Sequence, residues 1–305
     1  MIKRTLYFGN PAYLSKRNEQ LVINLPDAKG IDNLTGNNTI PIEDIGVVIL
    51  DHQQITITHG VMESLLENNV ALITCDKQRM PVGLMLPLEG NQIQSERFHD
   101  QIDASLPLKK QLWQQTIVSK ITNQAAMLHK HRNIQPKNMD YWASEVKSGD
   151  ADNHEARAAA YYWGEVFPEI AEFRRDREGI PPNNLLNYGY AVLRAVVARA
   201  LVSTGLLPTL GIHHHNRYNA YCLADDIMEP YRPVVDDIVL QIVKSKIPID
   251  EISKEIKIKL LSIPQSDVII NGQRSPLLIA VSQTTSSLYK CYAGESRKIS
   301  YPEIV

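Results

Sequence analysis

Apolar residues recur with two different periods along the chain, and the change falls near residue 95. Before that point, short apolar or alternating runs end at turn signals such as Gly9-Asn10-Pro11 and Pro87, a pattern typical of β-strands. Residues 59–68 differ, because their apolar side chains fall on one side of a helix. The strands expected are residues 4–8, 20–25, 46–50, 55–58, 70–74 and 82–86.

Beyond residue 95 the apolar positions follow the period of a helix. Asn153 is expected to be the N-cap of one helix, and Pro181-Pro182 and Gly205 bracket the clearest one. Glycine inside a helix usually has a packing reason, so Gly189 predicts a close approach between two helices. The helices expected are residues 96–132, 152–165, 183–204 and the stretch after Pro233.

Length and pattern together predict an α+β protein of two domains. A β-rich N-terminal domain is expected over residues 1–93, and a larger all-α domain over residues 97–305. The 305 residues are enough for two cores, and 44% hydrophobic residues is ordinary for a soluble protein. No apolar run approaches the length of a membrane span and no signal peptide is evident, so we expect no membrane partner.

Cysteine usage and charge narrow the class of protein further. Cys75, Cys222 and Cys291 are far apart and lack CxxC spacing, which fits reduced thiols in the cytoplasm better than a zinc site or disulfides. With 32 basic and 34 acidic residues, the net charge of −2 does not by itself predict nucleic-acid binding. Local stripes such as Lys109-Lys110 or Lys130-His131-Arg132 can be enough, although each alone is typical of a solvated surface.

The segment of residues 211–233 packs three adjacent histidines and several carboxylates into a short stretch. Imidazole nitrogen combined with carboxylate oxygen suits Mn²⁺ or Mg²⁺ better than a metal that prefers thiolates. If residues 222–229 are helical, Asp225, Asp226 and Glu229 share about one face, and a cation would relieve their repulsion. The alternative is that the two aspartates complement the dipole at the start of a helix. Composition does not tell which histidine would be the ligand.

Other polar residues belong to separate predicted elements. Glu155 is an acid that folding could bring to the histidine segment, but its own surroundings, like those of His154, are typical of an exposed helix residue. Asn187 is a candidate to support the site through a hydrogen bond. Asp236 and Asp237 are expected to be surface acids, because they lie about two turns beyond the cluster.

Three ordered blocks in the second half of the chain resemble a known family. They read NHEARAAAYYW, NNLLNYGYAVLRA and GLLPTLGIHHHNRYNAYCLADDIMEPYRPVVD, and they run from about residue 153 to 236. Together they are similar to the CRISPR-associated integrase family, the "Cas-one" family, in its type II form. IPIEDIGVVILD, ITITHG and VALITCD resemble the N-terminal domain of that family, so the resemblance covers nearly the whole chain.

The resemblance implies a set of catalytic residues that are also the metal ligands. Matched position by position, these are Glu155, His214 after Gly-Ile-His, and Glu229 at the end of Asp-Ile-Met-Glu. The cofactor implied is Mg²⁺ or Mn²⁺. Asp226 would be a supporting acid, and His213 would either support the site or face DNA.

The resemblance also implies an activity and partners. The enzyme would be a metal-dependent DNA endonuclease and integrase, which inserts foreign DNA fragments as new spacers into a CRISPR array. The reaction is a transesterification, in which a 3′-hydroxyl attacks a phosphodiester of the repeat. The partners implied are double-stranded DNA (prespacer and CRISPR repeat), a second copy bound through the N-terminal domain, a small second adaptation protein that completes a hetero-hexamer, and other type II CRISPR proteins.

Three other functions are compatible with the same residues. One is a small-molecule metallohydrolase, although the absence of an HExxH motif counts against its zinc-protease form. A metal-dependent nuclease of branched or single-stranded nucleic acid would use the same ligands with water as the nucleophile. A DNA-binding scaffold would need no chemistry, and an altered Glu155 or Glu229 would have favoured it; both acids are intact.

Overall fold

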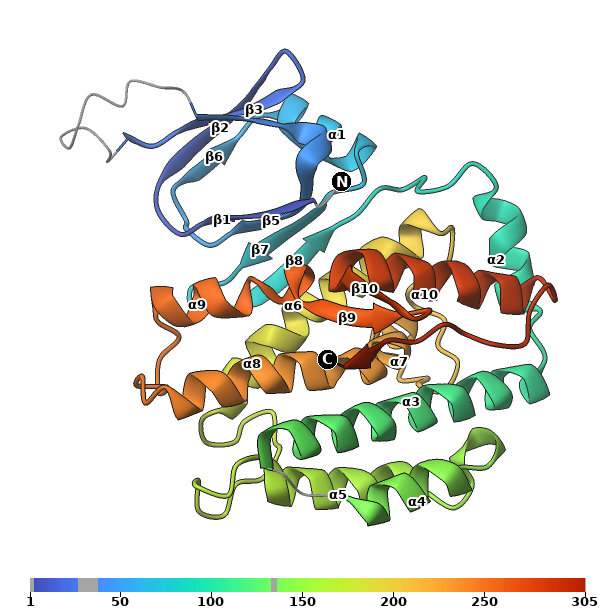
Figure 1. Cartoon of the computed structure of the whole chain (residues 1–305). Coiled ribbons are helices and arrows are strands. Elements are labelled where there is room, and N and C mark those ends of the chain that lie inside the picture. The colour runs from blue at the N-terminus through green and yellow to red at the C-terminus, as the bar shows by residue number, and fades with distance from the viewer. Residues whose placement is uncertain (1–2, 27–37, 133–135, 305) are drawn as a thin grey trace. The chain divides into compact units, whose positions relative to one another are not determined.

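A computed structural model of the chain describes residues 3–26, 38–132 and 136–304 (Figure 1). It divides into two compact units, Met1–Gly90 and Asn91–Val305. The first is rich in β-structure and the second is largely helical, so the α+β class predicted from the sequence is confirmed.

The first unit is built from two four-stranded sheets. Helix α1 (His59–Glu67) buries Val61 and Leu65 in the core of this unit, together with Leu14 and Leu21. One sheet has the order β1 (Arg4–Phe8), β5 (Ile45–Leu50), β7 (Ala71–Cys75) and β8 (Pro81–Met85). The other has the order β4 (Asn38–Pro41), β3 (Gln20–Asn24), β2 (Ala12–Arg17) and β6 (Ile55–Ile57).

Strand β5, in the sheet that also contains β1, β7 and β8, is a continuous apolar run in the sequence rather than an alternating one. It pairs in parallel with β1 on one side and β7 on the other, with Tyr7 opposite Ile49 and Val48 opposite Leu72. All of its residues except Leu50 are buried, because both faces of the strand are covered.

The second unit contains most of the helices of the described residues. Figure 1 shows how these helices are arranged. They are α2 (Gln94–Ile102), α3 (Leu106–Arg132), α4 (Lys137–Glu145), α5 (His154–Val166), α6 (Asn183–Ser203), α7 (Cys222–Met228), α8 (Arg232–Lys244), α9 (Lys254–Leu260) and α10 (Leu277–Tyr292). A 3-10 turn, η4 (Glu229–Tyr231), joins α7 to α8.

The prediction that the second domain is all-α was wrong in one detail. The unit is not all-α, because it carries a small sheet in the order β10 (Gln273–Pro276), β9 (Asp267–Ile270), β11 (Glu303–Ile304). These strands have four residues or fewer, too short for an alternating pattern to show. The helical run expected over residues 96–132 is divided between α2 and α3. Its proline, Pro107, lies in the first turn of α3, where no backbone donor is needed.

Helix α6 forms the centre of the second unit. Its length and hydropathy would suffice to cross a membrane, yet 78% of its most apolar window is buried inside the protein, as in the core helix of a soluble protein. The close approach predicted at Gly189 is confirmed, because a Cβ atom there would lie 2.4 Å from Cγ1 of Val235 on α8.

Asp236 and Asp237 are buried, so the prediction that they are surface acids was wrong. Oδ2 and Oδ1 of Asp236 accept hydrogen bonds from the hydroxyls of Tyr162 (2.9 Å) and Tyr190 (2.5 Å). Burial raises the pKa of Asp236 to about 6, although both hydroxyls act to lower it. The position of a buried aspartate in the sequence does not distinguish it from an exposed one, because its hydrogen-bond partners come from other helices.

The start of α5 is held by a residue other than the expected cap. Asn153 occupies the N-cap position with φ of 54° and makes no side-chain cap hydrogen bond. Instead, the carboxylate of Asp150 accepts hydrogen bonds from the backbone amides of His154 (2.9 Å) and Glu155 (3.0 Å). Asp150 therefore fixes the first turn of α5, where Glu155 lies.

We expect Asp150→Ala to lower the free energy of unfolding by about 1 kcal/mol, the usual effect of losing a helix cap. Asn153→Gly is the matched control, and it should change stability by less than about 0.5 kcal/mol because glycine adopts the positive φ freely. Urea unfolding followed by circular dichroism measures both. Equal losses for the two variants would contradict this account of the cap.

Candidate metal-binding active site

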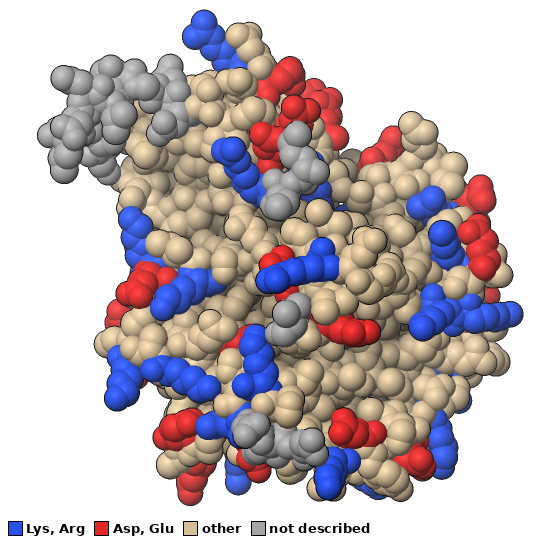
Figure 2. All heavy atoms as spheres, viewed as in Figure 1, with Lys and Arg blue, Asp and Glu red and all other residues tan. Residues whose placement is uncertain are grey.

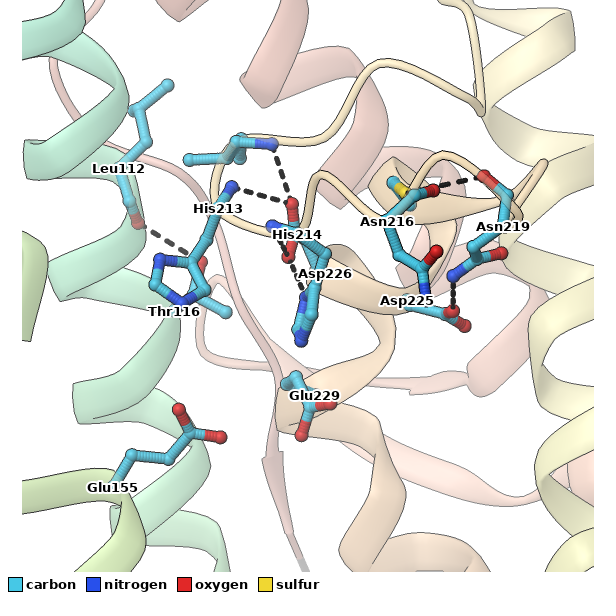
Figure 3. Close-up of polar contacts among 12 residues, drawn as sticks. Leu112, Thr116, Glu155, His213, His214, Asn216, Asn219, Asp225, Asp226 and Glu229 are labelled. Carbon is cyan, nitrogen blue, oxygen red and sulfur yellow. Dashed lines mark hydrogen bonds and ion pairs between the residues drawn. The ribbon is translucent and has the colours of Figure 1, made fainter. Parts of the chain in front are cut away.

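Three side chains from different elements of the second unit gather in one place (Figure 3). Glu155 comes from the first turn of α5, and Glu229 from the junction of α7 and η4. His214 comes from the loop that precedes α7. The side chain of Glu229 is only 6% exposed, that of Glu155 is 27% exposed and that of His214 is 44% exposed, so the site is open on the histidine side.

The two glutamates are joined by a lysine that the sequence did not single out. Nζ of Lys120, on α3, lies 2.6 Å from Oε1 of Glu155 and 2.7 Å from Oε2 of Glu229. Nε of Arg232 lies 2.9 Å from the other oxygen of Glu229. Burial by itself would raise the pKa of Glu229, but Arg232 and Lys120 lower it to about 2. Burial opposes the charge on Lys120, yet the two glutamates raise its pKa.

Asp226 organises the histidine loop from inside the protein. Its carboxylate has no exposed surface, and it accepts hydrogen bonds from the backbone amides of Ile212 (2.6 Å) and His213 (2.9 Å). Oδ1 of Asp226 also lies 2.5 Å from Nδ1 of His214, and this hydrogen bond raises the pKa of the imidazole. The loop can close this tightly because residue 211 is glycine. A Cβ atom there would lie only 2.3 Å from the carbonyl oxygen of His214.

The bond to Asp226 fixes the orientation of the His214 ring. With Nδ1 held by a carboxylate, Nε2 is left on the edge that points toward Glu229 in Figure 3. A histidine whose second nitrogen is held by a carboxylate is the usual arrangement of a metal ligand. The supporting role expected for Asp226 therefore has a defined geometry.

His213 is packed rather than aimed at the glutamates. Its ring stacks on Trp113 of α3, with centroids 4.2 Å apart and an interplanar angle of 4°. Burial, followed by the charge of His214, lowers the pKa of His213. Trp113 also contacts the His214 ring edge-on, at 5.7 Å between centroids. The stack anchors the loop to α3.

Two other candidates have their polar groups engaged elsewhere. Asp225 binds Nε of Arg194 at 2.6 Å and Nδ2 of Asn219 at 2.6 Å, and Figure 3 shows it turned away from Glu229, so the acids of α7 do not form one carboxylate face as predicted. The Asn187 amide accepts a hydrogen bond from Arg175 (2.7 Å) and donates one to the carbonyl oxygen of Arg177 (2.7 Å). Asn187 thus orders the loop before α6.

The donor set fits a divalent cation, although the site is not closed around one. Within the described residues, no group of three or more His, Cys, Asp or Glu side chains is arranged to hold a metal ion. Two carboxylates and a carboxylate-held imidazole are nevertheless ligands that Mg²⁺ or Mn²⁺ accepts. Oε2 of Glu229 is buried and receives no well-directed hydrogen bond in the described part of the chain. The positive charge of Lys120 stands between the carboxylates.

One signal in the sequence points to Lys120. Apolar residues recur at helical spacing at Trp113, Ile117 and Leu128, and Lys120, three residues after Ile117, falls on the same stripe of the helix. A charge on such a stripe is almost never buried unless it is paired. Arg232 carried no comparable signal, because it opens α8, where an exposed side chain is usual.

Comparisons with known proteins agree on a single family. The family model for CRISPR associated protein Cas1 matches residues 6–256. The CRISPR-associated endonuclease Cas1 of Neisseria meningitidis serogroup C (strain 8013) is 36% identical over 307 residues, which cover 100% of this chain and 97% of that protein.

Solved structures share the fold. A casposase bound to integration product superimposes with a TM-score of 0.73 at 19% identity, over 98% of this chain and 92% of the casposase chain. A chain of a Cas6-RT-Cas1–Cas2 complex gives a TM-score of 0.73 at 22% identity, over 97% of this chain and 35% of the other. The family match and the full-length relative show that this chain belongs to the Cas1 family of CRISPR-associated proteins.

Proposed function

We propose that this protein is a divalent-metal-dependent DNA endonuclease and integrase, which inserts DNA fragments as spacers into a CRISPR array by transesterification. The observation that carries the proposal is the convergence of Glu155, Glu229 and the carboxylate-held His214 in one site. Membership of the Cas1 family and the fold shared with a casposase bound to integration product support an integrase rather than a scaffold.

Glu155, His214 and Glu229 would hold Mg²⁺ or Mn²⁺. A metal bound there supplies Lewis-acid stabilisation of negative charge on the phosphoryl group and lowers the pKa of an attacking hydroxyl. The protein itself contributes orientation. Asp226 keeps Nδ1 of His214 engaged, so that Nε2 faces the glutamates, and Asp150 keeps Glu155 in place at the start of α5.

A cavity of about 390 Å³ opens beside His214 and offers a path for a DNA strand. Its lining combines positive charge with hydrogen-bonding groups, among them Lys109, His215, Asn216 and Arg217. Such groups bind phosphodiester oxygens without reading sequence. On the face seen in Figure 2, basic and acidic side chains are interspersed, which fits a local rather than a global DNA-binding surface.

The assembly proposed is the one that the sequence led us to expect. Two copies pair through the β-rich N-terminal domain, residues 1–93, and the α-helical domain, residues 97–305, carries the chemistry. A small Cas2-type protein completes a hetero-hexamer on double-stranded DNA, and other type II CRISPR proteins join it in the prokaryotic cytoplasm. The solved complex of a related chain with Cas2 supports the choice of partner.

A strand-transfer assay tests the proposal. The purified protein, its small partner, Mn²⁺, a labelled duplex with free 3′-hydroxyls and a supercoiled plasmid that carries the repeat should give label joined to the plasmid. His214→Ala and Glu155→Gln should lower joining at least about 100-fold, because each removes a ligand. His99→Ala, an exposed histidine of the same unit, is the control and should join normally.

Three outcomes of this assay are informative. Joining by wild type and by His99→Ala alone supports the integrase and its site together. Cleavage without joining would replace the integrase by the metal-dependent nuclease. Equal joining by His214→Ala and wild type would overturn the assignment of the ligands.

The orienting role of Asp226 gives a separate prediction. Asp226→Asn should lower joining about 10-fold to 100-fold, the usual effect of losing the carboxylate behind a ligating histidine. Asp225→Asn is the matched control, because the neighbouring carboxylate binds Arg194 and Asn219 and does not touch His214. Joining rates are measured on variants with unchanged circular dichroism spectra. Equal losses at the two positions would refute a specific role for Asp226.

DNA affinity should fall steeply with salt despite the net charge of −2. Each phosphate contact that is lost should reduce the slope of log K against log salt by about 0.9. Lys109→Ala combined with Arg217→Ala should therefore flatten the slope by about 2, whereas Lys254→Ala, an exposed lysine that does not line the cavity, should not. Fluorescence anisotropy at several salt concentrations measures the slopes. A flat titration of the wild type would exclude binding through phosphates.

A further inference from the structure

The Lys120 ammonium occupies the position between Glu155 and Glu229 where a bound divalent cation is expected. It bridges Oε1 of Glu155 and Oε2 of Glu229 at 2.6 Å and 2.7 Å, and the residue is only 8% exposed. Both contacts use carboxylate oxygens of the ligands proposed above. A divalent cation bound to the same two oxygens would need ligand distances of about 2.0–2.1 Å for Mg²⁺, which leaves no room for the ammonium between them.

We propose that Lys120 is a positioning residue that acts as an internal placeholder for the divalent cation. Its ammonium holds Glu155 and Glu229 together in the metal-free protein and leaves both carboxylates when the metal binds. The inference rests on the proposed function, because it requires that these glutamates are metal ligands. It adds that the affinity for metal is set by competition with a charge supplied by the chain.

The need for such a charge follows from burial. Two carboxylates that point into the same space repel each other, and removing them from water increases that repulsion. Arg232 compensates Glu229 on its other oxygen. In the described residues, Lys120 is the only Lys or Arg side chain found in an ion pair with Glu155. Without the ammonium or a metal, the pair would be left short of positive charge.

The two cations around Glu229 differ in their freedom to move. The guanidinium of Arg232 lies over the Tyr190 ring, 4.6 Å from its centroid, and Tyr190 in turn bonds to the buried Asp236. Arg232 is therefore held from both sides. Lys120 has a flexible stem of four carbons, so its ammonium can withdraw while α3 remains in place.

Binding of Mn²⁺ without DNA or partner tests the inference, with electron paramagnetic resonance used to count free Mn²⁺. Lys120→Met should bind Mn²⁺ at least about tenfold more tightly than the wild type, because the competing charge is gone. Lys120→Arg keeps the charge and should bind much more weakly than Lys120→Met. Lys110→Met removes an exposed lysine of the same helix and should bind as the wild type does.

Thermal unfolding supplies a second readout, which keeps the inference testable if the Lys120→Met protein is less stable. Without metal, Lys120→Met should unfold at a lower temperature than the wild type, since its carboxylates are uncompensated. Saturating Mn²⁺ should raise its melting temperature by more than it raises that of the wild type. A Lys120→Met protein that binds Mn²⁺ no more tightly than the wild type, or gains no more stability from it, overturns the placeholder role.

The test separates this inference from the proposed function. Glu155→Gln combined with Glu229→Gln should abolish tight Mn²⁺ binding whatever residue stands at position 120. If the double variant binds as well as the wild type, the metal site itself is misplaced. If it loses binding while Lys120→Met is unchanged, the metal site stands and only the role of Lys120 is wrong.

Discussion

Burial of the Glu229 carboxylate is the constraint on which the site depends. A buried carboxylate needs positive charge and hydrogen bonds to offset its loss of water. Here the charge comes from α3 through Lys120 and from α8 through Arg232. Glu155, on α5, enters the same network through Lys120. Three helices are therefore tied to one another by the pair of acids that is proposed to bind the metal.

Asp226 imposes the second constraint, on a loop that has no regular structure of its own. One buried carboxylate binds the amides of Ile212 and His213 together with the ring of His214. The Trp113–His213 stack holds the loop from the side of α3. In the proposal above, only the Lys120 ammonium moves when a metal binds, while the exposed edge of His214 stays in place. The proposed ligands are therefore held in position, and the exposed side of His214 leaves the site open to a metal ion.

The sequence predicted most elements and part of the site, for reasons that individual residues illustrate. Long periodic runs such as α6 and buried runs such as β5 were found because their own residues carry the pattern. The short strands β9 to β11 were missed because so few residues show no period. Glu155, His214 and Glu229 came from a family resemblance. Lys120, the Asp150 cap and the burial of Asp236 depend on partners distant in the chain, which spacing does not reveal.

The most direct measurement is anomalous diffraction at the manganese edge from crystals of the protein soaked in Mn²⁺. The account predicts an anomalous peak bounded by Glu155, Glu229 and the Nε2 edge of His214, with the ammonium of Lys120 withdrawn from both carboxylates. A saturated crystal with no peak there, and with Lys120 still bridging Glu155 and Glu229, would contradict it.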